Sequence, residues 1–429
     1  MHIIKKSIFL LLLIITFTSC TYILNENDVL TTGTTLAAYS NTVVIGTVSN
    51  DSSSGYITIV EEKDDKWNIV FTYKIPQRYR GPVSLAMNEK YICAGLDVKQ
   101  GKSGVVLVLK KENEKWKKAY YITSPKPYKD DLFGFSISLN NNQLLIGAKY
   151  YQNSGIAFLF ELNFTEYKTT YIFNAPESSN KFFGQCVFLL KDSFIITDPG
   201  YSNEQIKDTV NKINEGKVYI FDKQNYKSKK SYSIKSTSVY SQLGMSGFLS
   251  EEKVLISDGG SLYLIDDANL MNEIWGHDKK LKFVLYSRSI NYNYTFNDNY
   301  LIVSDTMYRF DQELKKANSI NLICNDGELD KPAGYYYLHN DLLLCTDLNC
   351  DNYVERENQK KLLAAEKRKT GNPKTVVTPP INQGRVHIIR LLPETGYTEE
   401  AIIARRTNSK GKIEFYDMLT EGCFNAEQN

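Results

Sequence analysis

The chain has 429 residues, of which 42% are hydrophobic and 23% are charged, so enough apolar residues are present to bury a core. The formal net charge is only +2 and the lysines and glutamates are interspersed, which argues against a nucleic-acid-binding protein. Two or three average domains would account for the length, but repeat proteins reach it by adding similar units.

The N-terminus has the features of an export signal. A basic segment at residues 2–6 precedes an apolar run from Ile8 to Phe17, and Cys20 follows two small polar residues. This run of ten residues, broken only by Thr16, is too short to span a bilayer, which needs about 20 apolar residues, and is typical of a signal peptide. The ending Phe17–Cys20 resembles a bacterial lipobox, although Phe17 departs from the usual aliphatic residue.

This resemblance implies that Cys20 carries a lipid. We therefore assign residues 1–20 to a signal peptide of the lipoprotein type and residues 21–33 to a tether. The predicted location is extracytoplasmic, with the protein held at a membrane through Cys20. The alternative is an ordinary secretory signal and a secreted protein, in which Cys20 is incidental.

A pattern of four β-strands recurs along the rest of the chain. Its clearest copy consists of Phe133–Leu139, Gln143–Ala148, Gly155–Phe160 and Tyr167–Phe173. These segments are rich in β-branched and aromatic residues and are bounded by Asn or Gly, as strands are. Four strands with tight connections are typical of one blade of a β-propeller.

The second strand of this pattern is the easiest to follow, because its apolar run is continuous and ends in small or acidic residues. A continuous run indicates a strand that is covered on both faces. The signature recurs at intervals of about 50 residues, as expected for a repeat architecture. It occurs at Val43–Thr47, Ile92–Gly95, Leu144–Ala148, Phe194–Asp198, Val254–Asp258, Leu301–Asp305 and Leu343–Asp347.

From these seven copies we predict an all-β fold, a seven-bladed β-propeller of four-stranded antiparallel blades over residues 34–408. Residues 409–429 are then a C-terminal extension. Ile402–Ala404 fits the outer strand of the last blade, which leaves Ile413–Tyr416 as an extra or a swapped strand. The way in which the ring closes stays open at this point.

Phe-Gly pairs mark the start of several units. Phe133-Gly134 precedes Ile146–Ala148, Phe183-Gly184 precedes Thr197–Pro199, and Leu243-Gly244 is a weaker third copy. These units resemble the FG-GAP repeat, the blade unit of α-integrin headpieces and of many bacterial surface proteins. The resemblance covers residues 34–408 and implies a propeller with an interaction role at a cell surface.

Members of that family often hold calcium in the turn between the first two strands. Here those turns have two to four residues, too few to supply the six to eight oxygen ligands of Ca²⁺. We therefore predict no metal and no cofactor. The aspartates that end the later second strands are expected to accept hydrogen bonds from loop amides, with a ligand role as the alternative. They are Asp198, Asp258, Asp305 and Asp347.

In a propeller the loops after the second and the fourth strands of each blade share one face, where function concentrates. Two insertions follow a second strand, at residues 199–215 and at residues 348–383, and the latter combines a charged helix with a proline-rich linker. The loops after fourth strands offer Tyr79, Arg80, Tyr128 and Lys129 as binding candidates, since Tyr and Arg are favoured at interfaces.

Catalysis has little support in the sequence. After the signal only His277, His339 and His387 remain, and none has a nucleophile context or metal-ligand spacing. We predict an interaction module with a protein or glycan partner and no catalytic residues. The alternative is an extracytoplasmic hydrolase with carboxylates at the central channel.

The six cysteines after Cys20 fall into two groups. Cys93 and Cys186 lie within strand patterns and are expected to be small buried side chains. Disulfide pairing among Cys324, Cys345, Cys350 and Cys423 stays open.

Overall fold

The structure, a computed structural model, describes most of the chain between residues 31 and 265 and a set of strands beyond it. The predicted signal peptide with Cys20, the insertion at residues 348–383 and most of the insertion at residues 199–215 lie outside the described residues. The continuous ranges are 31–48, 55–64, 66–98, 101–177, 181–202, 215–233, 242–250, 252–258 and 261–265.

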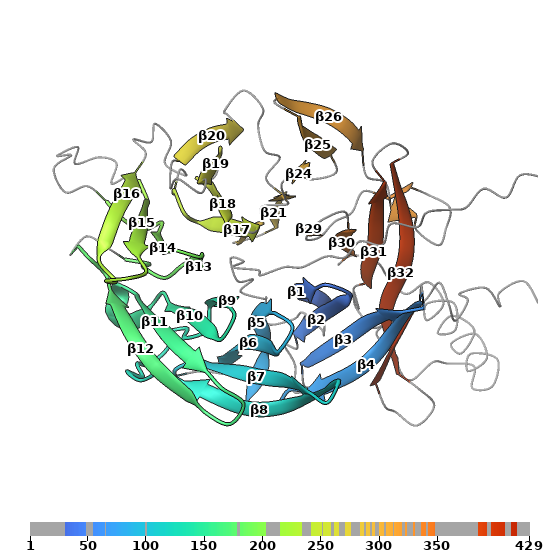
Figure 1. Cartoon of the computed structure of the whole chain (residues 1–429), viewed down its shortest axis with the longest axis horizontal. Helices are drawn as coiled ribbons and strands as arrows, with labels where there is room; N and C mark the ends of the chain where they lie inside the picture. Colours follow the sequence, from blue (N-terminus) through green and yellow to red (C-terminus); the bar gives the residue numbers. More distant parts are fainter. Residues whose placement is uncertain are drawn as a thin grey trace, which may run out of the picture.

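Apolar β-branched and aromatic segments form antiparallel sheets that stand around a common centre (Figure 1). We count as a blade each four-stranded sheet that follows directly on its predecessor, and five such blades succeed one another. Blade 1 has β1 (Thr31–Tyr39), β2 (Thr42–Val48), β3 (Tyr56–Lys63) and β4 (Lys66–Lys74), and blade 2 has β5 (Tyr79–Met87), β6 (Tyr91–Val98), β7 (Val105–Glu112) and β8 (Lys115–Thr123).

The next three blades repeat the same order. Blade 3 has β9 (Ser136–Asn140), β10 (Gln143–Ala148), β11 (Ile156–Leu162) and β12 (Tyr167–Asn174), with the short 3-10 helix η1 (Tyr151–Asn153) after β10. Blade 4 has β13 (Val187–Leu189), β14 (Ser193–Asp198), β15 (Lys217–Asp222) and β16 (Ser228–Ser233). Blade 5 has β17 (Ser246–Ser250), β18 (Lys253–Ser257), β19 (Leu262–Ile265) and β20 (Met271–Trp275).

The prediction of seven four-stranded blades is wrong, because the regular succession stops at five, after β20. A two-stranded sheet of β21 (Val284–Tyr286) and β22 (Ser289–Asn291) comes next, and then a four-stranded sheet of β23 (Tyr294–Phe296), β24 (Tyr300–Val303), β25 (Thr306–Asp311) and β26 (Glu313–Ser319). A second pair, β27 (Leu322–Ile323) and β28 (Leu329–Asp330), precedes a sheet of five strands, β29 (Tyr336–His339), β30 (Leu342–Asp347), β31 (Arg385–Leu392), β32 (Gly396–Thr407) and β33 (Ile413–Asp417). The second-strand signature recurs in β24 and β30, but it does not dictate how many strands pair around it.

Burial falls from the centre of the ring to its rim. Every residue of β2 is buried, as expected for a strand with a neighbouring blade on each face. The outer strand β4 instead alternates between exposed and covered positions, as a half-buried strand does. The outer strands of blades 1 to 4 carry lysines and no acidic residue, and lysine on an exposed edge opposes unwanted strand pairing.

Blades 2 to 5 are joined through the Phe-Gly pairs and the weaker Leu243-Gly244 copy. The carbonyl of Gly134 accepts a hydrogen bond of 2.7 Å from the Ser84 hydroxyl of the preceding blade. The same bond recurs from Ser136 to Gly184 at 2.8 Å and from Thr197 to Gly244 at 2.8 Å. Three junctions therefore pair a glycine carbonyl with a hydroxyl on the previous blade.

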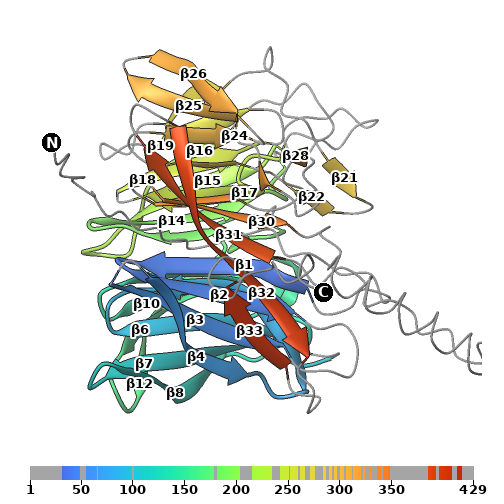
Figure 2. The same ribbon diagram turned by 90° about the vertical axis from the view of Figure 1, so that its right-hand side faces the viewer.

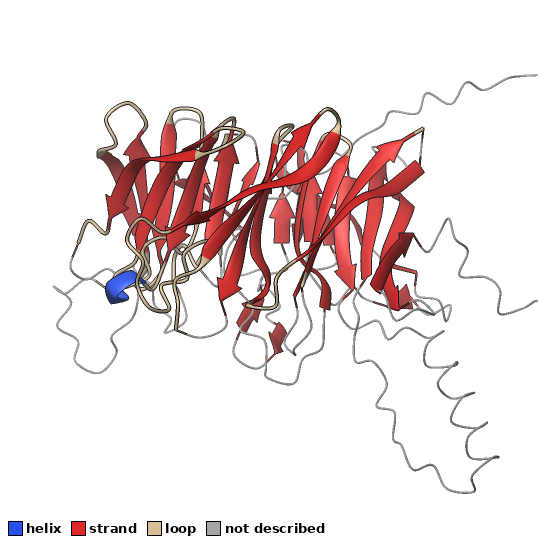
Figure 3. Ribbon diagram, turned by 90° about the horizontal axis from the view of Figure 1, so that it is seen from below, coloured by secondary structure: helices blue, strands red, loops and turns tan. Residues whose placement is uncertain are grey.

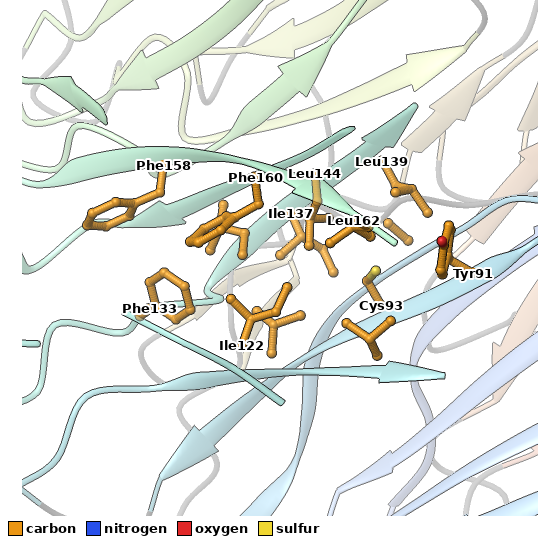
Figure 4. Close-up of a cluster of buried hydrophobic side chains, with 14 of the residues drawn as sticks. Tyr91, Cys93, Ile122, Phe133, Ile137, Leu139, Leu144, Phe158, Phe160 and Leu162 are labelled. Carbon is orange, nitrogen blue, oxygen red and sulfur yellow. The ribbon is translucent and has the colours of Figure 1, made fainter. Parts of the chain in front are cut away.

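The core lies between the blades rather than within a single sheet. Cys93 and Ile122 of blade 2 and Phe158 and Phe160 of blade 3 form one buried cluster with Phe133 from the connecting loop (Figure 4). The rings of Phe133 and Phe158 meet edge to face with centroids 5.6 Å apart. Each blade thus presents an apolar face that only its neighbour covers.

The two buried cysteines behave as predicted. Cys93 and Cys186 have no exposed surface, and they pack in the clusters between blades 2 and 3 and between blades 4 and 5, respectively. Burial raises the pKa of the Cys93 thiol, so it stays protonated and unreactive in the folded chain.

The ring closes by contact between its first and last sheets. β1 contacts β30 and β31, and β33 contacts β4 (Figure 2). Ile402–Ala404 lies in β32, and Ile413–Tyr416 lies in β33, which pairs antiparallel with β32. The C-terminal segment is therefore an extra fifth strand of the last sheet.

Candidate functional site

The chain order within each blade places the loops after its second and fourth strands on one side of the ring, which we call the loop face. The hairpin turns after the first and third strands lie on the other side, the turn face. Figure 3 shows η1 among the longer loops on the loop face, opposite the short turns. Most of the loop-face residues that the structure describes belong to the loops of blades 2 to 4.

Four aromatic side chains form two packed pairs on this part of the loop face, and the pairs are linked through the adjacent residues Tyr150 and Tyr151. Tyr128, from the loop between blades 2 and 3, lies edge to face with Tyr151 of η1, with ring centroids 5.7 Å apart. The adjacent Tyr150 packs in the same way against Phe182, from the loop between blades 3 and 4, also at 5.7 Å. We call Tyr128, Tyr151, Tyr150 and Phe182 the aromatic row.

One end of the row, Tyr128, and one of its middle residues, Tyr150, are exposed to solvent. Tyr128 is 43% exposed and Tyr150 is 37% exposed, although both rings also pack against another ring. The Lys149 ammonium lies 3.6 Å from the centroid of the Phe135 ring and 5.0 Å from that of Tyr150, so a cation sits beside the row.

The buried carboxylate of Asp131 fixes the loop that carries Tyr128. One oxygen accepts hydrogen bonds from the Ser103 hydroxyl at 2.8 Å and from the Tyr128 amide at 3.2 Å. The other accepts from the amides of Phe133 at 2.9 Å and Gly104 at 3.3 Å. Four donors offset the loss of hydration of a fully buried charge, and they join two loops of the face into one unit.

Backbone strain is stored in the same loop. Leu132 has a φ of 54° and Asp130 a φ of 55°, in the left-handed region that side chains other than glycine avoid. The Asp130 carboxylate accepts a 2.7 Å hydrogen bond from the amide of Gly101, which holds this conformation from the neighbouring loop. Strain of this kind persists where the surroundings enforce it, commonly at sites of function.

The four predicted binding residues have different environments. Tyr128 and Lys129 are exposed on the loop face, and Tyr128 begins the aromatic row. Tyr79 lies at the start of β5 and is only 5% exposed, in the core next to Tyr121. The backbone of Arg80 continues β5, so Tyr79 and Arg80 belong to a strand rather than to a surface loop.

The sequence did not indicate Tyr150, Tyr151 or Phe182. Tyr150 and Tyr151 directly follow the second-strand signature of blade 3, in a loop too short to stand out as an insertion. Phe182 precedes the Phe-Gly pair of blade 4 and looks like a further core residue. The only available signal was the position of the tyrosine pair after a second strand, where loop-face residues are expected.

The aspartates that end second strands accept hydrogen bonds from loop amides, as predicted. Asp198 accepts from the amides of Phe182 at 2.9 Å and Gly200 at 3.0 Å. Asp258 accepts from the Ser261 amide at 2.7 Å and from the Tyr263 hydroxyl at 3.2 Å. Asp305 and Asp347 have side chains outside the described residues.

A second polar cluster lies at the loop-face end of blade 4. The Glu177 carboxylate accepts hydrogen bonds from the Lys217 ammonium and the Tyr219 hydroxyl. Burial by itself would raise the pKa of Glu177, but the hydrogen bonds from Lys217, Tyr201 and Tyr219 and the charge of Lys217 lower it overall. The Lys217 ammonium also lies 4.5 Å from the centroid of the Tyr201 ring. The cluster therefore holds the loop that carries Glu177 against the loop that carries Tyr201.

Among the described residues, no group of three or more His, Cys, Asp or Glu side chains is arranged to hold a metal ion. In the same part of the chain, no helix combines the length and the hydropathy needed to cross a bilayer.

The fold and the loop face place the chain in the class of all-β propellers with four-stranded antiparallel blades. Neither a protein-family model nor a curated protein matches the sequence, so the FG-GAP resemblance is not confirmed. Among solved structures, the chain is similar to a putative 6-phosphogluconolactonase from Bacteroides fragilis, with 11% identity, a TM-score of 0.48, and coverage of 88% of this chain and 98% of that one.

Two further similar structures are also propellers. The β-propeller domain of the Trilobed protease from Pyrococcus furiosus has 11% identity and a TM-score of 0.46, with 87% of this chain and 98% of that one covered. The Pan2 WD40 domain from Neurospora crassa has 9% identity and a TM-score of 0.43, with coverage of 75% and 88%. At such identities the likeness concerns the fold, and it says nothing about activity.

Proposed function

We propose that this propeller is a binding module that captures its partner on the loop face of blades 2 to 4. The observation that carries the proposal is the aromatic row, in which Tyr128 and Tyr150 keep 43% and 37% of their surface exposed. Amphipathic rings on an otherwise rigid surface offer large contact areas at little cost in conformational entropy.

The rigidity of the loops supports the same function. Asp131 ties the Tyr128 loop to the loop before β7 through four hydrogen bonds, and the rings of the row brace one another across three loops. A surface that is ordered before binding loses less entropy when a partner docks.

An exported, membrane-held protein fits this role. The proposal has three further parts. Cys20 is the site of lipidation, the blades are of the FG-GAP type, and the partner is an extracytoplasmic protein or glycan. The hydroxyl-to-glycine bonds at Gly134 and Gly184 support the FG-GAP assignment, because they give the Phe-Gly pair the same structural role in two successive units, and Gly244 of the weaker Leu-Gly copy accepts a similar bond.

The alternative function, a hydrolase, needs carboxylates that are available for chemistry. The buried aspartates of the described loops, Asp131, Asp198 and Asp258, instead accept hydrogen bonds from backbone amides and hydroxyls. Such carboxylates hold loops in place, so the described residues favour binding over catalysis.

The test is capture from the native cell envelope with a doubly substituted chain, Tyr128→Ala with Tyr150→Ala. A matched control is Tyr39→Ala, because Tyr39 is 40% exposed but lies at the β1–β2 turn on the turn face. We expect the wild type and the control to retain the same partner and the double variant to lose it. Equal capture by all three would show that the aromatic row is not the binding surface.

A further inference from the structure

The chemistry around the aromatic row narrows the class of partner. This inference rests on the proposed binding function of the loop face. It concerns the described segments 101–104, 124–132, 149–155 and 181–183, which form the surface on both sides of the row.

Positive charge dominates the exposed side chains of these segments. Four lysines are exposed there, and Lys149 adds a fifth, partly covered ammonium against the Phe135 and Tyr150 rings. The acidic residues are Asp130, which accepts a hydrogen bond from the Gly101 amide, and the buried Asp131. The exposed lysines are Lys102, Lys126, Lys129 and Lys181.

The same surface lacks the apolar centre of a protein interface. The only large hydrophobic side chains of these segments that count as exposed are Tyr128 and Tyr150, and no aliphatic side chain joins them. Pro125 and Pro127 are also exposed, and other exposed groups are polar, such as Gln152 and Asn153. Interfaces between proteins usually surround a well-packed apolar core with a polar rim, and no such core is present here.

Rings, amides and ammonium groups in this arrangement match an acidic polysaccharide. The C–H faces of sugar rings stack on tyrosine, their hydroxyls bond to side-chain amides, and their carboxylates or sulfates pair with lysine. The row extends over three loops with 5.7 Å between the rings of each packed pair, so it suits an extended chain rather than a single sugar.

We propose that the aromatic row and its flanking lysines bind an acidic glycan, with its sugar rings along Tyr128, Tyr151 and Tyr150 and its anionic groups at Lys126, Lys129 and Lys181. The lysines supply charge at the edge of the surface, so binding weakens as salt rises. The rings supply the contact that persists in salt.

The test measures binding of the purified full chain to polygalacturonate and to its methyl ester, which shares the sugar backbone but lacks the charge. The variants are Lys126→Gln with Lys129→Gln, and Tyr128→Ala with Tyr150→Ala. The charge-matched control is Lys115→Gln with Lys229→Gln, because both of these lysines are exposed on outer strands away from the loop face.

We expect the wild type to bind polygalacturonate but not the ester. The affinity for polygalacturonate should fall about tenfold in each loop-face variant, a size typical of exposed charge pairs and exposed rings. The affinity of the control variant should be unchanged. Equal binding of acid and ester, or equal losses in the control pair, would overturn the inference. Capture of a protein by the aromatic row together with no binding to polygalacturonate would also overturn it and would leave the proposed binding role intact. If the chain neither captured a protein through the aromatic row nor bound polygalacturonate, the proposed binding role of the loop face would be wrong as well.

Discussion

The blade junctions make a strong prediction about stability, because glycine is required there for space. A Cβ added to Gly95 would lie 1.9 Å from the carbonyl oxygen of Gly134 in the next blade, where real contacts stay above 3.0 Å. It would also lie 2.4 Å from the Ser84 hydroxyl oxygen, which bonds to the same carbonyl. Gly95→Ala must therefore push two blades apart.

The cost follows from two terms. Overpacking of a close contact typically costs about 1–3 kcal/mol, and a buried carbonyl that loses its hydrogen bond costs about 1–3 kcal/mol more. We expect Gly95→Ala to lower the free energy of unfolding by about 2–6 kcal/mol, a large share of the roughly 5–15 kcal/mol typical of a folded domain. Ser84→Ala removes only the bond and is expected to cost about 1–3 kcal/mol.

The assay is urea unfolding followed by circular dichroism and tryptophan fluorescence. Gly101→Ala serves as the control: Gly101 has a φ of +73°, but its added Cβ would meet only the end of the Lys129 side chain, at 3.5 Å. That change is expected to cost about 1–2 kcal/mol, the usual penalty of the left-handed region. If Gly95→Ala proved no more damaging than Gly101→Ala, the close approach of neighbouring blades would be refuted.

Three further predictions concern single groups. Asp131→Ala leaves amides of two loops without their acceptor and is expected to lower the free energy of unfolding by about 3 kcal/mol. Urea unfolding measures this change, and an unchanged midpoint would contradict the role of Asp131 in holding the two loops together. Because its folded pKa is lowered, Glu177 stabilises the chain above the ordinary value of 4.5, and this contribution is lost as pH falls through the folded pKa. Glu177→Gln should therefore cost up to about 1 kcal/mol at pH 7 and less as the pH falls below 4.5, in unfolding experiments over a range of pH. A thiol reagent should modify Cys93 only after unfolding, and rapid reaction in the native state would contradict its burial.

The sequence was sufficient to predict the unit of the fold, because each blade repeats the same local pattern. The four segments predicted from Phe133 to Phe173 correspond to β9–β12, and the continuous apolar runs correspond to buried second strands. The number of blades was wrong for a physical reason. The signature marks a strand covered on both faces, but it does not specify what lies between two copies or how many strands join each sheet. The pairs β21–β22 and β27–β28, which carry no signature, interrupt the succession, and the sheet around β30 has five strands.

The candidate site was predictable only in part. Tyr128 and Lys129 were found because a Pro- and Lys-rich loop after a fourth strand is exposed by its position. Tyr79 looked similar, but its amide bonds to the Pro76 carbonyl at 2.9 Å in a tight turn, so β5 begins at Tyr79 and carries its ring into the core. The contacts of Tyr150 and Phe182 depend on how three loops meet, which no local pattern specifies.

Hydrogen–deuterium exchange with and without the partner captured from the envelope tests the central claim most directly. Binding on the loop face predicts slower exchange of the amides in residues 124–132, 149–155 and 181–183, with the outer strands β8 and β12 unchanged. Protection that is confined to the outer strands or to the hairpin turns of the opposite face would contradict the account.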